Sequence, residues 1–231
     1  MGDNILFSLW NFQVSFVLLI EVISSILSFL CILFAVKEKI WTFPLGMVST
    51  AMYFFVFFMQ ELYSSMTLQI MFFTFNAYGL YKWTHPSEKD ATKADNTLAV
   101  TLLKLKGRVL TGTTIVVLTL IFGYVTSNLF KGEELEYNYT YIPLVFQKLY
   151  KYIFLYKVYI DAFILSASLV AQYLMAIKKL ESWAIWFLVD IIATLFYFIT
   201  VGWATGILYF VFIFTAVMGW IEWKKSMLRN R

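Results

Sequence analysis

An aspartate lies inside a hydrophobic run of this chain, in the segment ESWAIWFLVD. Trp183, Trp186 and Asp190 occupy positions i, i+3 and i+7, and Thr194 and Tyr197 continue this spacing. In a helix the spacing places all of these side chains on one face. The indole rings could stack on a flat aromatic ligand, while the carboxylate could meet a hydroxyl group or a positively charged ring. The alternative is structural, with Trp183 at the membrane interface and Asp190 as a hydrogen-bond acceptor within the fold.

Other hydrophobic segments carry polar side chains at helical spacing. Gln69 and Asn76 are seven residues apart, and Asp161, Ser168 and Gln172 occupy positions i, i+7 and i+11. An amide in a hydrocarbon environment is costly unless it finds a partner or lines a wet cavity. We therefore expect Gln69, Asn76 and Gln172 to line a cavity. We expect only interhelical hydrogen bonds from the serines of the first hydrophobic segment, Ser24, Ser25 and Ser28.

The composition predicts a membrane protein that crosses the bilayer several times. The chain is 61% hydrophobic and 20% aromatic, whereas soluble domains are about 45–50% apolar. Seven segments have a length near the ~20 residues that a spanning helix needs: 14–36, 42–60, 62–83, 107–130, 155–177, 183–201 and 203–223. The segment THPSEKDATKADNT, between the third and fourth, is clearly polar. The Tyr-rich stretch between the fourth and fifth is expected to form an external loop with an interfacial helix at 143–154.

The residue inventory argues against several kinds of chemistry. Cys31 is the only cysteine and His85 the only histidine, so a disulfide framework and a thiol metal cluster are excluded, and a histidine metal site or a Ser–His nucleophile is disfavoured. We expect no catalytic residues, metal or cofactor, and hence no enzyme. The last predicted span, 203–223, has no lysine that could bind retinal as a Schiff base, which disfavours a photoreceptor.

Basic residues predict the orientation in the membrane. With the N-terminus outside and the C-terminus in the cytoplasm, every Lys and Arg falls on the inner side except four, Lys131, Lys148, Lys151 and Lys157. Cytoplasmic loops are enriched in Lys and Arg, which favours this orientation. The topology also explains the net charge of +4, so no nucleic-acid partner is expected.

An internal repeat emerges when the chain is shifted by 140 residues. Four positions then coincide, as Glu21 with Asp161, Lys39 with Lys179, Gly79 with Gly219, and Trp83 with Trp223. A two-residue slip also pairs Trp41 with Trp183. These coincidences predict an all-α membrane protein of seven helices, with two parallel three-helix repeats, 14–83 and 155–225, joined by a linker region at 84–154. In transporters built this way the substrate site lies at the repeat interface near the membrane midplane.

Four segments together resemble the PnuC-type nicotinamide riboside transporters: WTFPLGMVST, LYSSMTLQIMFFTFNAYGLYKW, DAFILSASLVAQYLMAIKKLESWAIWFLVD and GILYFVFIFTAVMGWIEW. The resemblance covers roughly residues 15–83 and 155–225. Its most specific part is W-x-x-W-x-x-x-D just after a K-K-x-E-x-W turn. It implies a three-plus-one-plus-three helix architecture related to SWEET sugar transporters. It also implies a homotrimer, with one pathway per protomer, in a bacterial inner membrane.

The resemblance implies a function as well: facilitated diffusion of nicotinamide riboside, which a cytoplasmic kinase then phosphorylates and traps. By motif, Trp183, Trp186 and Asp190 belong to the binding stripe, and Gln69 and Asn76 face them from the first repeat. With the residues singled out by spacing, the full set of expected substrate contacts is Trp183, Trp186, Asp190, Gln69, Asn76, Gln172, Tyr197 and Asp161.

One departure from the family pattern leaves the substrate open. After the Asp-Ala that opens the fifth span, the chain reads Phe163-Ile164-Leu165 where nicotinamide riboside carriers are expected to have a Thr-rich turn. The alternatives are a sister transporter for thiamine, riboflavin or a deoxynucleoside, or a SWEET-like sugar carrier. Coupling to protons through Glu21, Asp161 or Asp190 also remains open.

Overall fold

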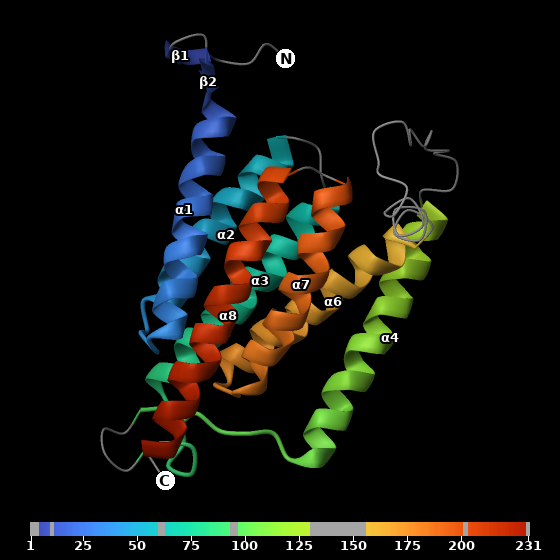
Figure 1. Cartoon of the computed structure of the whole chain (residues 1–231). Coiled ribbons are helices and arrows are strands. Elements are labelled where there is room, and N and C mark those ends of the chain that lie inside the picture. The colour runs from blue at the N-terminus through green and yellow to red at the C-terminus, as the bar shows by residue number, and fades with distance from the viewer. Residues whose placement is uncertain are drawn as a thin grey trace. The chain divides into compact units, whose positions relative to one another are not determined.

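The computed structural model describes residues 5–9, 12–59, 63–92, 97–129, 156–200 and 203–229. These residues form a short hairpin followed by seven helices (Figure 1). The first helices are α1 (Phe16–Val36), α2 (Thr42–Met59) and α3 (Tyr63–Thr84). Then come α4 (Leu105–Leu129), α6 (Lys157–Ala176), α7 (Glu181–Thr200) and α8 (Trp203–Arg229). The expected all-helical fold with seven long helices is confirmed.

The N-terminal hairpin was not expected from the sequence. Strands β1 (Ile5–Leu9) and β2 (Phe12–Ser15) pair in antiparallel fashion, with Leu9 opposite Phe12 and a register irregularity between Ile5 and Phe7. The hydrophobic run predicted to begin a span at residue 14 therefore becomes helical only at Phe16. The expected interfacial helix at 143–154 lies outside the described residues.

Six of these helices are long and apolar enough to cross a membrane: Phe16–Val36, Thr42–Met59, Leu105–Asn128, Lys157–Ala176, Glu181–Ile199 and Gly206–Arg229. Helix α3 is the exception by composition, because it carries Gln69, Asn76 and Lys82. Its length is sufficient: 22 residues extend about 33 Å at 1.5 Å per residue, against a hydrocarbon core of about 30 Å. Its low hydropathy reflects amides that require partners inside the protein.

The chain divides into two compact units, and the first comprises Met1–Thr101, Gln172–Leu180 and Met218–Arg231. Within it α2 packs against both α1 and α3 (Figure 1). Hydroxyl groups join α1 to α2: Ser28 Oγ lies 2.6 Å from Ser49 Oγ, and Ser49 Oγ donates to the carbonyl of Ser24 at 2.9 Å. Ser25 Oγ is hydrogen-bonded to the Tyr53 hydroxyl. The prediction that these serines form interhelical hydrogen bonds is confirmed.

Aromatic side chains fill one end of this unit. The ring of Phe43 lies edge-on to Trp83 at 4.9 Å between centroids, and Trp83 contacts Trp223 at 5.8 Å. Trp223 also donates its indole N–H to the carbonyl of Ala35, the penultimate residue of α1, at 2.9 Å. Gly79 makes room for this cluster, since a Cβ there would overlap the ring of Phe43. The two tryptophans matched by the 140-residue shift are thus direct neighbours.

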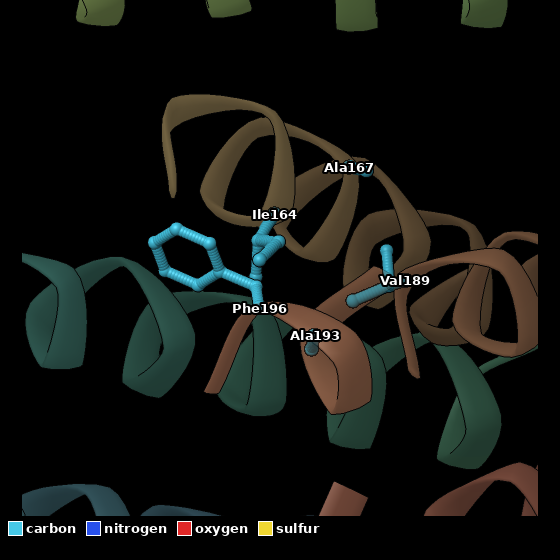
Figure 2. Packing of buried hydrophobic residues seen from close by; sticks show 5 residues of the cluster. All are labelled: Ile164, Ala167, Val189, Ala193 and Phe196. Carbon is cyan, nitrogen blue, oxygen red and sulfur yellow. The ribbon is translucent and has the colours of Figure 1, made fainter. Parts of the chain in front are cut away.

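The second unit comprises Leu102–Ala171 and Glu181–Val217. Its core joins α6 to α7 through Ile164 and Ala167 on one helix and Val189, Ala193 and Phe196 on the other (Figure 2). The two alanines allow the helix backbones to approach closely, which is the usual packing mode of membrane helices.

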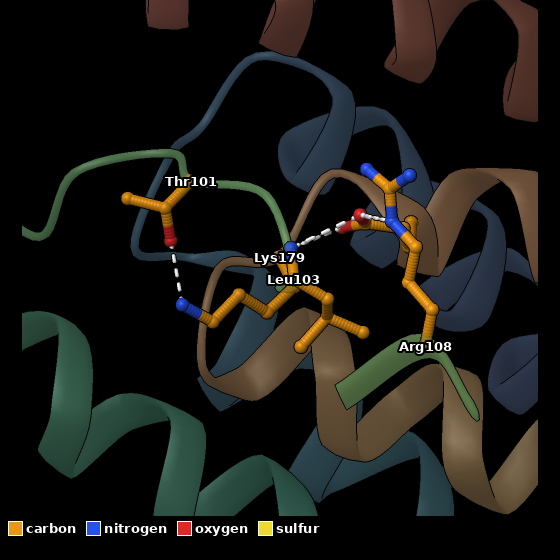
Figure 3. Close-up of polar contacts among 5 residues, drawn as sticks. Thr101, Leu103, Arg108 and Lys179 are labelled. Carbon is orange, nitrogen blue, oxygen red and sulfur yellow. Dashed lines mark hydrogen bonds and ion pairs between the residues drawn. The ribbon is translucent and has the colours of Figure 1, made fainter. Parts of the chain in front are cut away.

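Polar contacts anchor the segment that leads into α4 (Figure 3). In the second unit, the carboxylate of Glu181 accepts the backbone N–H of Leu103 at 3.0 Å and the guanidinium Nε of Arg108 at 3.1 Å. In the first unit, Lys179 Nζ donates to the Thr101 hydroxyl at 2.6 Å. Glu181 lies in the first turn of α7, where a carboxylate also interacts favourably with the helix dipole.

Gly79→Ala is expected to lower the melting temperature of the detergent-purified protein, because the added methyl group has to displace the Phe43 ring. Overpacking of this kind costs about 1–3 kcal/mol. The matched control is Gly112→Ala in α4, where an added Cβ meets no atom within 4 Å. That change should be neutral or stabilising by about 0.5–1 kcal/mol. Equal melting temperatures for the two variants would contradict the packing described here.

Candidate functional site

The polar stripe of α7 lies on the face of the helix that is turned into the protein. Trp183, Asp190 and Thr194 are buried, and Trp186 and Tyr197 are half-buried. The exposed residues of the helix are hydrophobic and belong to the other side: Phe187, Leu188, Leu195 and Phe198. The spacing therefore predicted correctly which face of the helix is enclosed.

Asp190 is a buried acid whose carboxylate is unpaired within the part of the chain that the structure describes. Its side chain belongs to a residue that is only 3% exposed. The Thr194 hydroxyl donates to the backbone carbonyl of Asp190 at 2.6 Å and so does not serve the carboxylate. No described Lys or Arg forms a salt bridge with it. Because a buried carboxylate is costly without donors, a ligand that brings hydroxyl groups or positive charge is its natural partner.

The two tryptophans of the stripe differ in access. Trp183 is 2% exposed, so it is enclosed by protein and is not an interfacial residue facing lipid headgroups. Trp186 is half-buried and packs beside the α6–α7 core of Figure 2, which leaves part of its ring accessible. The proposed pairing of Trp183 with Trp41 in the repeat is wrong, because Trp41 is 61% exposed. Phe43, which lies 140 residues before Trp183, is buried in the same way.

A pair of tyrosines extends the polar surface of the second unit. The hydroxyl groups of Tyr197 in α7 and Tyr209 in α8 are hydrogen-bonded, and their ring centroids are 4.9 Å apart. Asp161 of α6 is near enough to interact electrostatically with both phenols. The structure therefore brings the expected residues Asp161 and Tyr197 together. Sequence reasoning missed Tyr209, whose signal is a single hydroxyl in the apolar run GILYFVF.

In the first unit the structure joins two of the expected amides. Gln172 Nε2 donates to Asn76 Oδ1 at 3.2 Å, and Asn76 Nδ2 donates to the carbonyl of Phe72 at 2.9 Å. Gly46 of α2 lies beside the buried Asn76 amide, and a Cβ at this position would be 2.6 Å from Oδ1. The absence of a side chain at Gly46 thus lets Asn76 reach Gln172. Gln69 is half-buried on the same helix and has no hydrogen bond to this amide pair.

The chemistry of these groups suits a neutral or cationic polar ligand. They are carboxylates, amides, phenols and an indole, and α7 contains no Lys or Arg. Among the residues described, no group of three or more His, Cys, Asp or Glu could hold a metal ion. An inorganic anion or a phosphate would find acceptors here rather than a cationic partner.

Comparison with known proteins gives a consistent result. The family model described as "Nicotinamide mononucleotide transporter" matches residues 18–225. The chain is 25% identical over 223 residues to the nicotinamide riboside transporter PnuC of Escherichia coli K12, covering 90% of this chain and 85% of that protein. Over 217 residues it is 22% identical to the PnuC protein of Neisseria mucosa, covering 90% and 73% of the two chains. The crystal structure of a vitamin B3 transporter PnuC superposes with a TM-score of 0.63 at 21% identity, covering 92% and 83% of the two chains.

The family model spans most of the chain, and the chain therefore belongs to the nicotinamide mononucleotide transporter family. It is a multi-pass membrane protein and not an enzyme.

A double-mutant cycle tests the amide pair. We expect Asn76→Leu and Gln172→Leu to be coupled by about 1 kcal/mol in thermal unfolding, since each change alone leaves a polar group without its partner. Thr74→Val combined with Gln172→Leu is the control, because Thr74 bonds only the carbonyl of Ile70 in its own helix. Additivity of the Asn76 and Gln172 effects would contradict the hydrogen bond.

Proposed function

We propose that this member of the nicotinamide mononucleotide transporter family takes up nicotinamide riboside by facilitated diffusion. The curated relatives that match most of its length are named as nicotinamide riboside transporters. The observation that carries the proposal is the buried, unpaired carboxylate of Asp190. Nicotinamide riboside has ribose hydroxyl groups that can donate to a carboxylate and a pyridinium ring whose positive charge a carboxylate attracts.

Each expected residue has a distinct part in this proposal. Trp186, with part of its ring accessible, stacks on the pyridinium ring, and the enclosed Trp183 supports it. Asp190 binds ribose hydroxyls. The amides and phenols supply hydrogen bonds to the ribose or to the carboxamide of the ligand: Gln69, Asn76, Gln172 and Tyr197. Asp161 adds negative charge that favours a cationic ligand.

The same chemistry favours the riboside over the mononucleotide. The mononucleotide carries a phosphate that would meet Asp190 and Asp161 with like charge, and α7 offers no basic side chain to offset it. Unpaired like charges of this kind discriminate strongly between otherwise similar ligands. The transported species in this proposal is therefore unphosphorylated, and phosphorylation by a cytoplasmic kinase retains it in the cell.

The proposal includes a topology and a mechanism. The N-terminus lies outside and the C-terminus in the cytoplasm of a bacterial inner membrane, in agreement with the distribution of Lys and Arg. Two three-helix repeats, α1–α3 and α6–α8, are joined by α4, within segments 14–83, 84–154 and 155–225. They rock against each other to give alternating access. Three protomers assemble as a homotrimer, each with its own pathway.

A sister substrate is the second candidate, and the departure at Phe163 favours it. In this structure Phe163 lines an open apolar pocket with Tyr159, Ile160 and Ile192. A side chain that lines an apolar surface cannot provide the hydroxyl expected of a Thr-rich turn. Thiamine, riboflavin and deoxynucleosides share a flat ring with nicotinamide riboside, so they are the competitors to test, together with a simple sugar.

Isothermal titration of the purified protein against this ligand set is the direct test. We expect nicotinamide riboside to bind and nicotinamide mononucleotide to give no heat. Heat with thiamine, riboflavin or a deoxynucleoside alone would retain the transporter assignment but transfer the substrate to a sister branch. Binding of a sugar alone would contradict the role given to Trp186.

Asp190→Asn is expected to weaken nicotinamide riboside binding about 10- to 100-fold, which corresponds to about 1.4–2.8 kcal/mol. The change keeps the shape of the side chain but removes its charge and one acceptor. Ser28→Ala is the control, since Ser28 bonds Ser49 between α1 and α2 and should change the Kd by less than about threefold. Similar losses for both variants would reduce Asp190 to a structural residue.

A further inference from the structure

The turn that follows α1 and the turn that follows α6 have the same backbone structure. After α1, the N–H of Glu38 bonds the carbonyl of Ala35, and the N–H of Lys39 bonds that of Phe34. After α6, the N–H of Lys178 bonds the carbonyl of Met175, and the N–H of Lys179 bonds that of Leu174. Each bond in one turn has its counterpart 140 residues later. Both turns are Schellman motifs, which satisfy the last carbonyls of a helix.

Both turns place an unexpected residue at the left-handed position. Glu38 has a φ of 53° and Lys178 a φ of 56°, and they are the non-glycine residues with positive φ in the described chain. Glycine is the usual residue here, because a Cβ in this conformation costs about 1 kcal/mol. A non-glycine residue retained at such a position in both turns suggests that its side chain has a function.

The two side chains bind each other. Lys178 Nζ lies 2.8 Å from Glu38 Oε2, and Lys178 is only 4% exposed. The same ammonium donates to the carbonyl of Leu98 at 2.8 Å and lies 4.5 Å from the centre of the Trp83 ring. All of these residues belong to the first unit. One buried ion pair thus joins the turn between α1 and α2, the turn between α6 and α7, and the segment that follows α3.

The segment after α3 is held across the second turn. The N–H of Thr101 bonds the carbonyl of Lys178, the N–H of Leu180 bonds the carbonyl of Thr101, and Lys179 Nζ bonds the Thr101 hydroxyl (Figure 3). Leu98 and Val100 of this segment are buried. The segment is therefore ordered by the same turn that carries the ion pair.

The aromatic residues beneath the ion pair break the symmetry of the two turns. Trp223 donates its N–H to the carbonyl of Ala35 at 2.9 Å. Its counterpart Trp83 has a buried indole N–H that meets no acceptor among the described residues. Trp83 instead offers its ring face to the ammonium of Lys178. The contact made by Lys178 is thus specific to one repeat and is not a copy of a repeated structural feature.

We propose that the Glu38–Lys178 ion pair is a latch that holds this end of the transporter closed and separates when the two repeats open there. The proposal rests on the alternating-access function given above, in which the first helices of the two repeats must part at each face in turn. By the orientation proposed above, this is the cytoplasmic end, where bound substrate would be released.

An ion pair is well suited to a reversible contact of this kind. The attraction between buried charges is largely offset by the loss of their hydration, so the closed and open states can lie close in free energy. When the turns part, both charged groups regain water together. A hydrophobic contact of similar area would have no such compensation, and its exposure would oppose opening.

The test measures access to a thiol placed below the latch. Cys31→Ser removes the one native cysteine, and Ser226→Cys introduces a reporter one helical turn beyond Trp223, at a position that is buried in this structure. In this background the detergent-purified full-length protein is labelled with a water-soluble maleimide. Leu228→Cys, at an exposed position on the same helix, is the control for general reactivity.

Glu38→Gln and Glu38→Gly are the informative variants, because both remove the carboxylate whereas glycine fits the turn better. We expect each to raise the labelling rate of the buried thiol at least about tenfold, equivalent to about 1.4 kcal/mol of lost preference for the closed state. The exchange Glu38→Lys with Lys178→Glu should bring the rate back within about threefold of the parent, since it restores an ion pair. Labelling at the Leu228→Cys control should not change.

Two results would overturn the latch. Unchanged labelling in Glu38→Gln would show that the ion pair does not keep this end closed. Parental labelling in Glu38→Gly together with fast labelling in Glu38→Gln would show that the turn conformation matters and the charge does not. Melting temperatures of each variant identify any that fail to fold, and Lys178→Met then replaces them. The labelling rate is read without substrate, so a failure of nicotinamide riboside to bind leaves this test intact.

Discussion

Hydrocarbon offers no hydrogen bonds, and this constraint governs every polar group in the helices of this protein. Most of these groups are satisfied by a neighbour. Ser28 and Ser49 bond each other between α1 and α2, Asn76 takes the amide of Gln172, and Tyr197 takes the hydroxyl of Tyr209. Asp190 differs, because its carboxylate has no such partner among the described residues. The group that the fold leaves unsatisfied is the one best placed to bind a ligand.

The repeat supplies a symmetric framework, but the polar chemistry within it is not symmetric. The turns after α1 and α6 match bond for bond. At the corresponding positions of the other repeat, however, Asp190 matches Thr50, Gln172 matches Ile32, and Asn76 matches Ala216. A small asymmetric ligand needs different groups at its two ends, so substitution within one repeat at a time could create a binding surface without disturbing the shared packing.

Small residues decide where the polar groups can meet. Gly46 leaves the space that lets the Asn76 amide reach Gln172, and Gly79 leaves the space for Phe43 beside Trp83. At both positions a methyl group would collide with the side chain that now occupies the gap. Close helix approach through glycine is therefore part of the construction of the polar sites as well as of the packing.

The sequence by itself determined the helices, the membrane class and the enclosed face of α7, because these follow from hydrophobic length and from the 3.6-residue period. It also identified the 140-residue repeat, through residues such as Trp83 and Trp223. Only the tertiary structure decided which residues meet. It placed Phe43 rather than Trp41 in register with Trp183, added Tyr209 to the polar groups, and joined Glu38 to Lys178. Periodicity specifies the face on which a side chain lies, but a contact between distant segments depends on how helices pack and on the space that residues such as Gly46 leave open.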